Sequence, residues 1–310
     1  MTRAVTSISS RSYLVLGFRM LLPEKLKRLA QQPTGERWLA ELPETVTDLV
    51  RRWDLQLGEP YAGANVSYVA PAVRGKDRVV LKVQWPHEEA MHEADALRVW
   101  DGNGAVRLLA HDAGRHALLL EHCSPGTYLA ESKDVDPCAV LIELLPRLWK
   151  PVAAPFKRLA EEAQEWASHL HPSWEAAGRP CERELVDAAA EFLADLASSQ
   201  GEQVLLHQDL HGENVLAAER EAWLVIDPKP LAGEREFALA PIIRSFEFGH
   251  SPAMSSGDWT DCRPSSGSIA TAPAAGLSRK PSPGVSTATT LIVITRRHVG
   301  FWRLDRKERS

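Results

Sequence analysis

The sequence predicts an α+β fold in two lobes, a strand-rich first lobe with one embedded helix and a mainly helical second lobe. Apolar residues alternate in the stretch between residues 61 and 121, which is the pattern of β-strands. They recur with the helical period, at three- and four-residue spacings, from residue 22 to about residue 57 and again after residue 126. A chain of 310 residues is long enough for two lobes with hydrophobic cores.

The first lobe shows the clearest strand pattern. Two alternating stretches, residues 66–70 and 79–83, flank turn residues at 74–77 and predict an antiparallel hairpin. A further buried strand is expected at residues 118–120, where three leucines follow one another. Between them, an apolar stripe over residues 88–100 predicts the embedded helix.

The second lobe shows two long amphipathic stretches. They predict helices around residues 159–170 and 185–196, and Gly201 is expected to close the second helix. Short apolar strands then bracket a polar loop, and they are expected at residues 204–206, 215–217 and 224–226.

Periodicity and composition together divide the chain into four segments. Residues 1–19 are an N-terminal extension left uncommitted, residues 20–122 the first lobe, residues 123–250 the second lobe and residues 251–310 a tail. The tail is rich in Ser, Thr, Pro and Gly without periodicity, which is typical of a linker or a disordered segment. Because the helical period stops abruptly after His250, we hypothesise that the tail is an out-of-frame reading, which sequencing of the DNA would test.

Charge and composition exclude several classes of protein. The net charge of -5 argues against nucleic acid as a partner and suits a cationic small molecule. There is no run of about 18 apolar residues, so no span across a membrane is expected. The four cysteines form no C-x-x-C pair, which fits reduced thiols and a cytoplasmic protein.

Chemistry-bearing residues concentrate in the segment HQDLHGENVL at residues 207–216. It holds Asp209 and, five positions later, Asn214, and the apolar strand that follows ends at Asp227. An acidic residue, an Asn and a second acidic residue in this order form the acceptor and metal set of a protein-kinase-like phosphotransferase. Phosphoryl transfer needs a carboxylate beside the incoming hydroxyl and oxygen ligands for magnesium.

A zinc hydrolase is the competing interpretation of this segment, since His207 and His211 are four positions apart with Asp209 between them. Two histidines at this spacing converge on one metal only in a helix, and the flanking apolar strands disfavour a helix. We expect His207 to brace the loop through hydrogen bonds. The pattern assigns no role to His211.

The first lobe supplies a lysine and an acidic partner for it. Strand alternation puts Lys82 on the face opposite Leu81 and Val83, and Glu93 lies on the apolar stripe of the predicted helix. A carboxylate there needs a partner if it is buried. The two match the strand lysine and helix glutamate that position nucleotide phosphates in kinases. The alternative is a surface lysine and a solvated glutamate.

Residues 61–67 lie where a kinase places its nucleotide-covering turn. The segment has small residues and one glycine, Gly63. Backbone N–H groups near Ala64 and Asn65 are candidates for a phosphate contact, and an ordinary turn is an equal alternative.

Residues 207–216, together with the runs 226–230 and 233–237, resemble the aminoglycoside phosphotransferase family, in particular its branch of streptomycin 6-phosphotransferases and hydroxyurea-resistance kinases. The resemblance covers roughly residues 22–250. It implies the two-lobed protein-kinase-like fold, with residues 20–122 as the nucleotide-binding lobe. It also implies ATP and Mg²⁺ as cofactors and transfer of the γ-phosphoryl group to a hydroxyl of an aminoglycoside antibiotic, streptomycin above all.

The same resemblance assigns roles to single residues. Asp209 corresponds to the catalytic base, and Asn214 and Asp227 correspond to the magnesium ligands. The strand that ends at Glu121 lies where kinases join their lobes, so the backbone of the segment that includes Glu121 and Cys123 is expected to hydrogen-bond adenine.

Two departures from the family pattern leave the activity open: the residue at position 238, and the chain after His250, where the family continues with amphipathic helices that complete the substrate lobe. The family usually carries an acid at the position of Ala238, where it braces the catalytic loop. Acidic residues of the second lobe are candidates for binding a cationic acceptor, although most fit the solvated faces of helices; they are Glu161, Glu162, Glu165, Glu182, Glu184, Asp187, Glu191 and Asp195.

Two alternative functions remain. The first is a kinase of the same fold that acts on another hydroxyl, such as that of hydroxyurea, a sugar or choline. The second is a nucleotide-binding protein without activity, its substrate lobe impaired by the altered tail.

Overall fold

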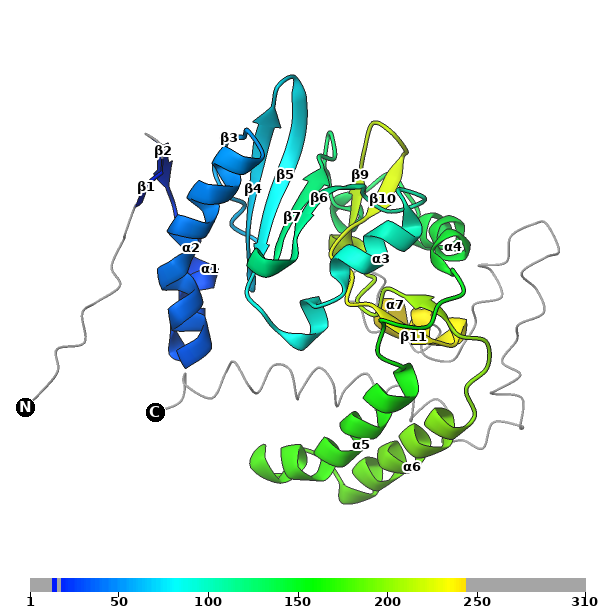
Figure 1. The fold of residues 1–310 in the computed structure, drawn as a ribbon. Helices are drawn as coiled ribbons and strands as arrows, with labels where there is room; N and C mark the ends of the chain where they lie inside the picture. The colour runs from blue at the N-terminus through cyan, green and yellow to red at the C-terminus, as the bar shows by residue number, and fades with distance from the viewer. Residues whose placement is uncertain (1–12, 16–17, 244–310) are drawn as a thin grey trace, which may run out of the picture. The chain divides into compact units, whose positions relative to one another are not determined.

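The computed structural model describes residues 13–15 and 18–243 and separates into two compact units, residues 1–126 and 127–310 (Figure 1). The sequence places the corresponding boundary after residue 122. The predicted tail, residues 251–310, lies outside the described residues, as does most of the extension at residues 1–12.

The first unit is built around a five-stranded antiparallel sheet of strand order β3-β4-β5-β7-β6. Its strands are β3 (Gln56–Leu57), β4 (Ser67–Arg74), β5 (Asp77–Gln84), β6 (Leu108–Asp112) and β7 (Ala117–Glu121). Its helices are α1 (Glu24–Lys27), α2 (Pro33–Arg52) and α3 (Glu93–Trp100), with 3-10 turns η1 (Arg28–Gln31), η2 (Glu88–Ala90) and η3 (Ala113–Arg115).

The predicted hairpin is present as β4 and β5, which pair along their whole length from Ser67 opposite Gln84 to Arg74 opposite Asp77. Gly75 in the turn has φ of 62°, a left-handed conformation that glycine adopts without steric cost. The predicted strand at residues 118–120 is the centre of β7. Its partner β6 is not predicted by the sequence, because most of its residues are half-buried and give no alternation.

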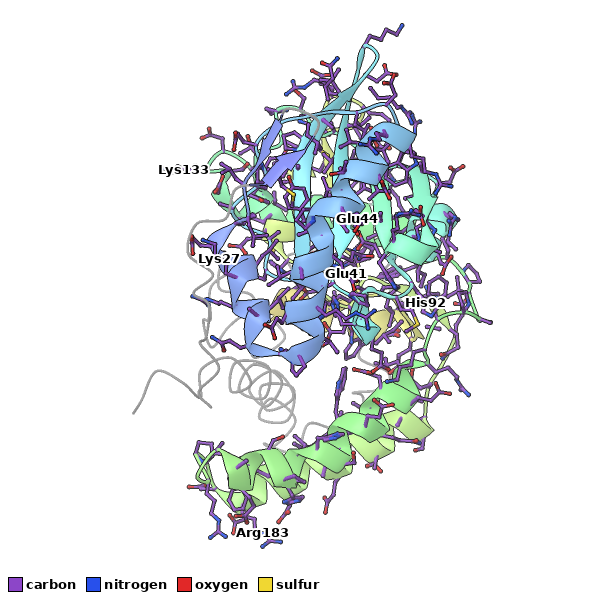
Figure 2. The ribbon with its side chains drawn as sticks, turned by 60° about the vertical axis from the view of Figure 1, so that its left-hand side comes forward. Lys27, Glu41, Glu44, His92, Lys133 and Arg183 are labelled. Carbon is purple, nitrogen blue, oxygen red and sulfur yellow. The ribbon has the colours of Figure 1, made fainter. Side chains whose placement is uncertain are left out.

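Helix α2 supplies the apolar layer against the sheet. Leu42, Val46 and Leu49 on one face of α2 share a buried core with Tyr68 of β4 and Leu81 of β5. These residues recur at three- and four-residue spacings, so one face of the helix is apolar. The opposite face carries charged residues exposed to solvent, among them Glu41 and Glu44 (Figure 2).

The sequence predicts two helices of the first unit too long. The stretch from residue 22 breaks at Gln32, which has extended φ and ψ of -112° and 135° before Pro33. Proline has no N–H group and is favoured at the first helical position, so it starts a new helix. Helix α2 ends at Arg52, so the expected helix up to residue 57 is wrong there. Helix α3 begins at Glu93, because residues 88–90 form a separate 3-10 turn.

The sequence also predicts that the folded part begins near Met20, and this expectation is wrong. Strands β1 (Tyr13–Val15) and β2 (Phe18–Met20) pair antiparallel within the extension that the sequence left uncommitted.

The second unit holds the helices and short strands expected of it. Helices α4 (Pro137–Leu148), α5 (Leu159–Ala176), α6 (Arg183–Ser198) and α7 (Leu239–Ile243) accompany the strands β8 (Val204–Leu206), β9 (Val215–Ala217), β10 (Trp223–Val225) and β11 (Leu231–Gly233). Three 3-10 turns complete it, η4 (Leu129–Glu131), η5 (Gly212–Asn214) and η6 (Arg235–Ala238). Strands β8 and β9 have the predicted bounds, and β10 is displaced by one residue.

Helices α5 and α6 lie side by side (Figure 1) and share the buried residues Ala163, Leu170, Val186, Ala189 and Leu193. Helix α6 ends at Ser198, and Gly201 donates its N–H to Oε2 of Glu234 at 3.3 Å, so the expected role of Gly201 as the closing residue is wrong. Helix α4 is not predicted, although an Asp136 cap precedes it.

Strand pairing in the second unit frames the polar loop. Strand β8 pairs with β11 and β9 pairs with β10, both antiparallel. The loop after β8 therefore connects the pair β8–β11 to the pair β9–β10. The segment between β10 and β11 runs back beside this loop. No helix in the described part of the chain combines the length and the apolar character needed to cross a membrane.

Candidate active site

In the first unit, Lys82 of β5 contacts Glu93 at the start of α3. The ammonium nitrogen lies 2.8 Å from Oε1 and 2.6 Å from Oε2 of Glu93. The two residues are 5% and 1% exposed, so the alternative of a solvated lysine and glutamate does not apply. A charge buried this deeply is stable only with a partner, and each residue supplies it for the other.

Gln84 is a third member of this cluster that the sequence interpretation missed. Its Nε2 donates to Oε2 of Glu93 at 2.5 Å, and Gln84 is 5% exposed. The signal was available, because alternation along β5 puts residues 82 and 84 on one face. Glu93 thus accepts hydrogen bonds from two donors of a single strand, which fixes its carboxylate relative to the sheet.

Glu121 and Cys123 lie at and just beyond the end of β7. The N–H of Glu121 donates to the carbonyl oxygen of Arg107 at 3.0 Å, and its carboxylate accepts from the Arg107 N–H at 3.0 Å. The side chain of Glu121 therefore ties β7 to the chain before β6. Strand pairing places Glu121 opposite Val79, further along β5 from Lys82. Cys123 is 7% exposed.

The segment at residues 61–67 forms a turn, and its backbone is held by one backbone hydrogen bond and one bond from a lysine side chain. The Tyr61 N–H donates to the Val69 carbonyl oxygen at 2.8 Å, and the Lys25 ammonium donates to the Gly63 carbonyl oxygen at 3.3 Å. Open space surrounds the position that a side chain would occupy at Gly63. The turn is present, and its part in covering a nucleotide stays a prediction.

In the second unit, the polar loop after β8 is fixed by bonds within itself. The Asp209 N–H donates to the His207 carbonyl oxygen at 2.8 Å. The carbamoyl nitrogen of Asn214 donates to the Asp209 carbonyl oxygen at 2.8 Å. The sequence motif therefore folds into a closed loop in which Asn214, 8% exposed, holds the backbone of Asp209.

His207 braces this loop as the sequence predicts. It is 3% exposed, and its Nε2 donates to the carbonyl oxygen of Ile226 at 2.8 Å. Burial lowers the pKa of His207 from 6.5 to about 4, chiefly because the charged form would lose its hydration. The imidazole is therefore neutral at pH 7, which suits a permanent hydrogen bond between the loop and the end of β10.

His211 also has a structural role, which the sequence did not reveal. Its Nδ1 accepts from the Glu213 N–H at 3.3 Å, and its Nε2 lies 3.2 Å from the carbamoyl nitrogen of Asn214. The backbone at His211 is extended and not helical. Among the described residues, no group of three ligating side chains includes His207 or His211, which speaks against the zinc hydrolase.

Asp227 follows β10 in a strained backbone conformation. Its φ is 57°, and Gln208 in the polar loop after β8 has φ of 62°. Left-handed residues other than glycine are uncommon, and they gather where function demands a particular orientation. The backbone N–H of Ile226 donates to the backbone carbonyl oxygen of Asn214 at 3.0 Å. The segments that contain Asn214 and Asp227 are therefore adjacent.

The donor chemistry of these residues fits a magnesium ion. Asp209, Asn214 and Asp227 offer carboxylate and carbamoyl oxygens, the ligands that hard cations prefer. The side-chain amide nitrogen of Asn214 donates to the backbone carbonyl oxygen of Asp209. The side-chain oxygen of Asn214 could therefore bind a cation. Asn214 and Asp227 would hold the ion, and its charge would neutralise that of the nucleotide phosphates.

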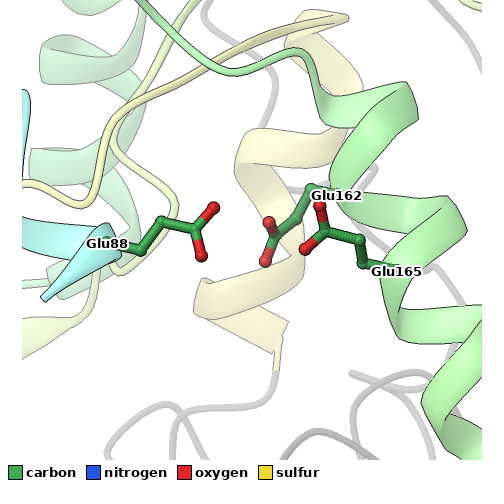
Figure 3. A group of neighbouring side chains, drawn as sticks. All are labelled: Glu88, Glu162 and Glu165. Carbon is green, nitrogen blue, oxygen red and sulfur yellow. The ribbon is translucent and has the colours of Figure 1, made fainter.

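Several acidic residues offered as ligands for a cationic acceptor already pair with side chains of their own unit. Glu162 and Glu165 extend from neighbouring turns of α5 (Figure 3), and the Lys157 ammonium lies 2.8 Å and 2.7 Å from their carboxylates. Asp187 of α6 lies 3.1 Å from Nε2 of His171. These contacts favour structural roles for the three acids.

Ala238 stands where the family resemblance leads us to expect an acid, and it lies next to the polar loop after β8. It is 5% exposed and lines a small cavity of about 10 Å³ together with His207 and Gln208. A cavity of this size holds about one water molecule. This cavity lies between Ala238 and the residues of the loop.

Comparison with known proteins finds a matching family model and several similar proteins. The family model described as aminoglycoside/hydroxyurea antibiotic resistance kinase matches residues 52–250. Streptomycin 6-kinase of Streptomyces glaucescens is 39% identical over 214 residues, which cover 68% of this chain and 69% of that protein. Hydroxyurea phosphotransferase of Kitasatospora aureofaciens is 41% identical over 225 residues, which cover 69% of this chain and 65% of that protein.

Solved structures share the fold at low sequence identity. Choline kinase LicA from Streptococcus pneumoniae has a TM-score of 0.56 at 12% identity, covering 87% of this chain and 92% of that one. A spectinomycin phosphotransferase in complex with ADP and spectinomycin has a TM-score of 0.52 at 12% identity, covering 86% and 90%. The fold is therefore protein-kinase-like, and because the matching model covers more than half of the sequence, the chain belongs to the aminoglycoside/hydroxyurea antibiotic resistance kinase family.

Proposed function

We propose that the protein is an ATP- and Mg²⁺-dependent kinase that transfers the γ-phosphoryl group to a hydroxyl of an aminoglycoside antibiotic, with streptomycin as the first candidate. The observation that carries the proposal is the closed loop in which Asn214 holds the backbone of Asp209, beside the segment of Asp227. Relatives named streptomycin 6-kinase, at 39% identity, support the choice of acceptor.

Asp209 orients the acceptor hydroxyl and takes its proton. As the acceptor oxygen bonds to the γ-phosphorus, the bond from that phosphorus to the bridging oxygen breaks and ADP leaves. Lys82, held by Glu93, binds the phosphates of the nucleotide. The chain's part in this reaction is mostly positioning, which agrees with the hydrogen-bonded loop around Asp209.

Hydroxyurea is the second candidate acceptor. It is favoured by the relative named hydroxyurea phosphotransferase, which is 41% identical. Both acceptors are small molecules, and the net charge of -5 does not oppose a cationic antibiotic. Choline and sugars have less support, because the choline kinase resembles this chain only in fold.

The test is an assay of the full chain with Mg²⁺-ATP and each acceptor in turn: streptomycin, hydroxyurea, choline and none. We expect ADP formation that depends on streptomycin, and a product whose mass increases by one phosphoryl group. Phosphorylation of hydroxyurea alone would replace the first candidate by the second. If calorimetry shows that Mg²⁺-ATP binds while no acceptor is phosphorylated, the protein is an inactive nucleotide binder. A chimera that carries a relative's sequence after His250 would then show whether the tail causes the loss.

A further inference from the structure

We propose that Lys229 is a positioning residue for the catalytic base, a role that rests on the function proposed above. Its ammonium nitrogen lies 3.0 Å from Oδ2 of Asp209. An ionised donor and acceptor at this distance form a charge-assisted hydrogen bond, which is stronger than a neutral one. The bond fixes the rotamer of Asp209 and thereby the carboxylate oxygen that faces the acceptor hydroxyl.

The backbone N–H groups of Lys229 and Asp209 both donate to one acceptor, the carbonyl oxygen of His207. The carbonyl oxygen of His207 accepts from the Asp209 N–H at 2.8 Å and from the Lys229 N–H at 3.0 Å. The side chains of Lys229 and Asp209 also contact each other, so the two residues are linked both through the His207 carbonyl oxygen and directly. Lys229 is therefore attached to the catalytic loop at both its backbone and its side chain.

Strand pairing explains why these residues meet. Strands β8 and β11 are antiparallel, and Leu206 lies opposite Leu231 at the end of β8. The chain that leaves β8 toward Asp209 therefore passes the chain that enters β11 from Lys229. Proline on each side of Lys229, at residues 228 and 230, restricts the backbone of the segment before folding.

The burial of the pair decides what it can contribute. The side chains of Lys229 and Asp209 are 29% and 18% exposed. Solvent-exposed ion pairs add little stability, because water screens them and both side chains lose freedom. Here the backbones are already held, and the pair acts on orientation. Orientation matters in this reaction, because phosphoryl transfer depends on positioning and a misplacement of about 1 Å can cost about 100-fold in rate.

Kinetics of Lys229 variants, of Asp209→Asn with and without Lys229→Met, and of one control test the role. In Lys229→Met we expect kcat to fall about 10-fold or more, with the KM for ATP changed less than about threefold. Lys229→Arg retains a cationic donor and should recover most of the loss. In the background of Asp209→Asn, the change Lys229→Met should cause no further loss, because the residue acts through Asp209. Lys133→Met, at an exposed lysine of the same unit (Figure 2), is the matched control and should match the wild type.

A second measurement does not depend on activity. Vicinal NMR couplings of Asp209 report its χ1 rotamer in the chain without substrate, with Asp209→Asn used for assignment. We expect one rotamer in the wild type and in Lys229→Arg, and averaged couplings in Lys229→Met. If the rotamer stays fixed without the lysine, the inference fails, whether or not the chain phosphorylates an antibiotic. If the couplings average as expected while the wild type phosphorylates no acceptor, only the proposed function fails.

Discussion

Lys82 and Glu93 form an ion pair with a shortest distance of 2.6 Å, and both residues are almost completely excluded from water. Gln84 donates to the same carboxylate, so the pair belongs to a hydrogen-bonded cluster on one face of β5. A buried pair of this kind costs desolvation when it forms and much more when it is broken, because the remaining charge stays buried.

This asymmetry predicts the effect of removing one partner. Glu93→Ala should lower the free energy of unfolding by about 3–5 kcal/mol, since the charge of Lys82 is left buried. The double variant Lys82→Met, Glu93→Leu should recover most of that loss and still bind nucleotide poorly. Urea denaturation measures the first effect and calorimetry with Mg²⁺-ATP the second. Lys76→Met, at an exposed lysine in the turn of the hairpin, is the control. A Glu93→Ala protein as stable as the wild type would contradict the buried pair.

Asp209 is expected to act in turnover and not in nucleotide binding. Asp209→Asn should lower kcat by a factor on the order of 100 or more, because this is the size of a general-base contribution. Affinity for Mg²⁺-ATP, measured by calorimetry, should change little. Activity that survives this substitution nearly intact would refute Asp209 as the base.

The positive φ of Asp227 predicts that glycine at this position is more stable than alanine, although either substitution removes a carboxylate needed for activity. Asp227 is exposed, so little packing is lost on substitution, and glycine adopts φ of 57° without strain. Asp227→Gly should therefore be more stable than Asp227→Ala by about 1 kcal/mol, while both lose activity. At Asp134, an exposed aspartate without positive φ, the glycine variant should be no more stable than the alanine variant. Equal stabilities of Gly and Ala at residue 227 would exclude backbone strain there.

The buried imidazole of His207 predicts a loss of stability in mild acid. Below pH 6.5 the unfolded chain binds a proton at His207, whereas the folded chain does not until about pH 4. The free energy of unfolding therefore decreases as the pH falls between these values, by about 2 kcal/mol from pH 7 to pH 5. Urea denaturation of the wild type and of His207→Gln at both pH values measures how much of the decrease in the free energy of unfolding comes from His207. The glutamine retains a donor for Ile226 and does not titrate, so a variant with the wild-type pH dependence would contradict the prediction.

Tyr68 predicts a stabilising substitution. Its hydroxyl is buried and has no hydrogen-bond partner in the part of the chain that the structure describes, and burial raises its pKa to about 12. Tyr68→Phe removes a polar group that lost its water on folding and should raise the free energy of unfolding by about 1 kcal/mol. Tyr61→Phe, at a tyrosine 43% exposed, should change stability by less than about 0.5 kcal/mol. A clear loss of stability in Tyr68→Phe would show that the hydroxyl has a partner.

Local patterns in the sequence were sufficient for the hairpin β4–β5, the helices α5 and α6 and the short strands around the catalytic loop. They also identified Lys82 through strand alternation, because the face of a residue in a strand depends only on its parity. Helix ends were less predictable. The break at Gln32 comes from Pro33, which starts a new helix, and the late start of α3 at Glu93 comes from the separate 3-10 turn at residues 88–90.

The sequence by itself determined the fold class and the residue types of the catalytic set, because periodicity and motif spacing are properties of neighbouring positions. Only the tertiary structure decided which residues hold that set in place. Gln84 meets Glu93 because α3 begins beside β5, and Lys229 meets Asp209 because β11 returns antiparallel to β8. Such contacts join segments that are distant along the chain, and their partners are chosen by strand register, which no local pattern records.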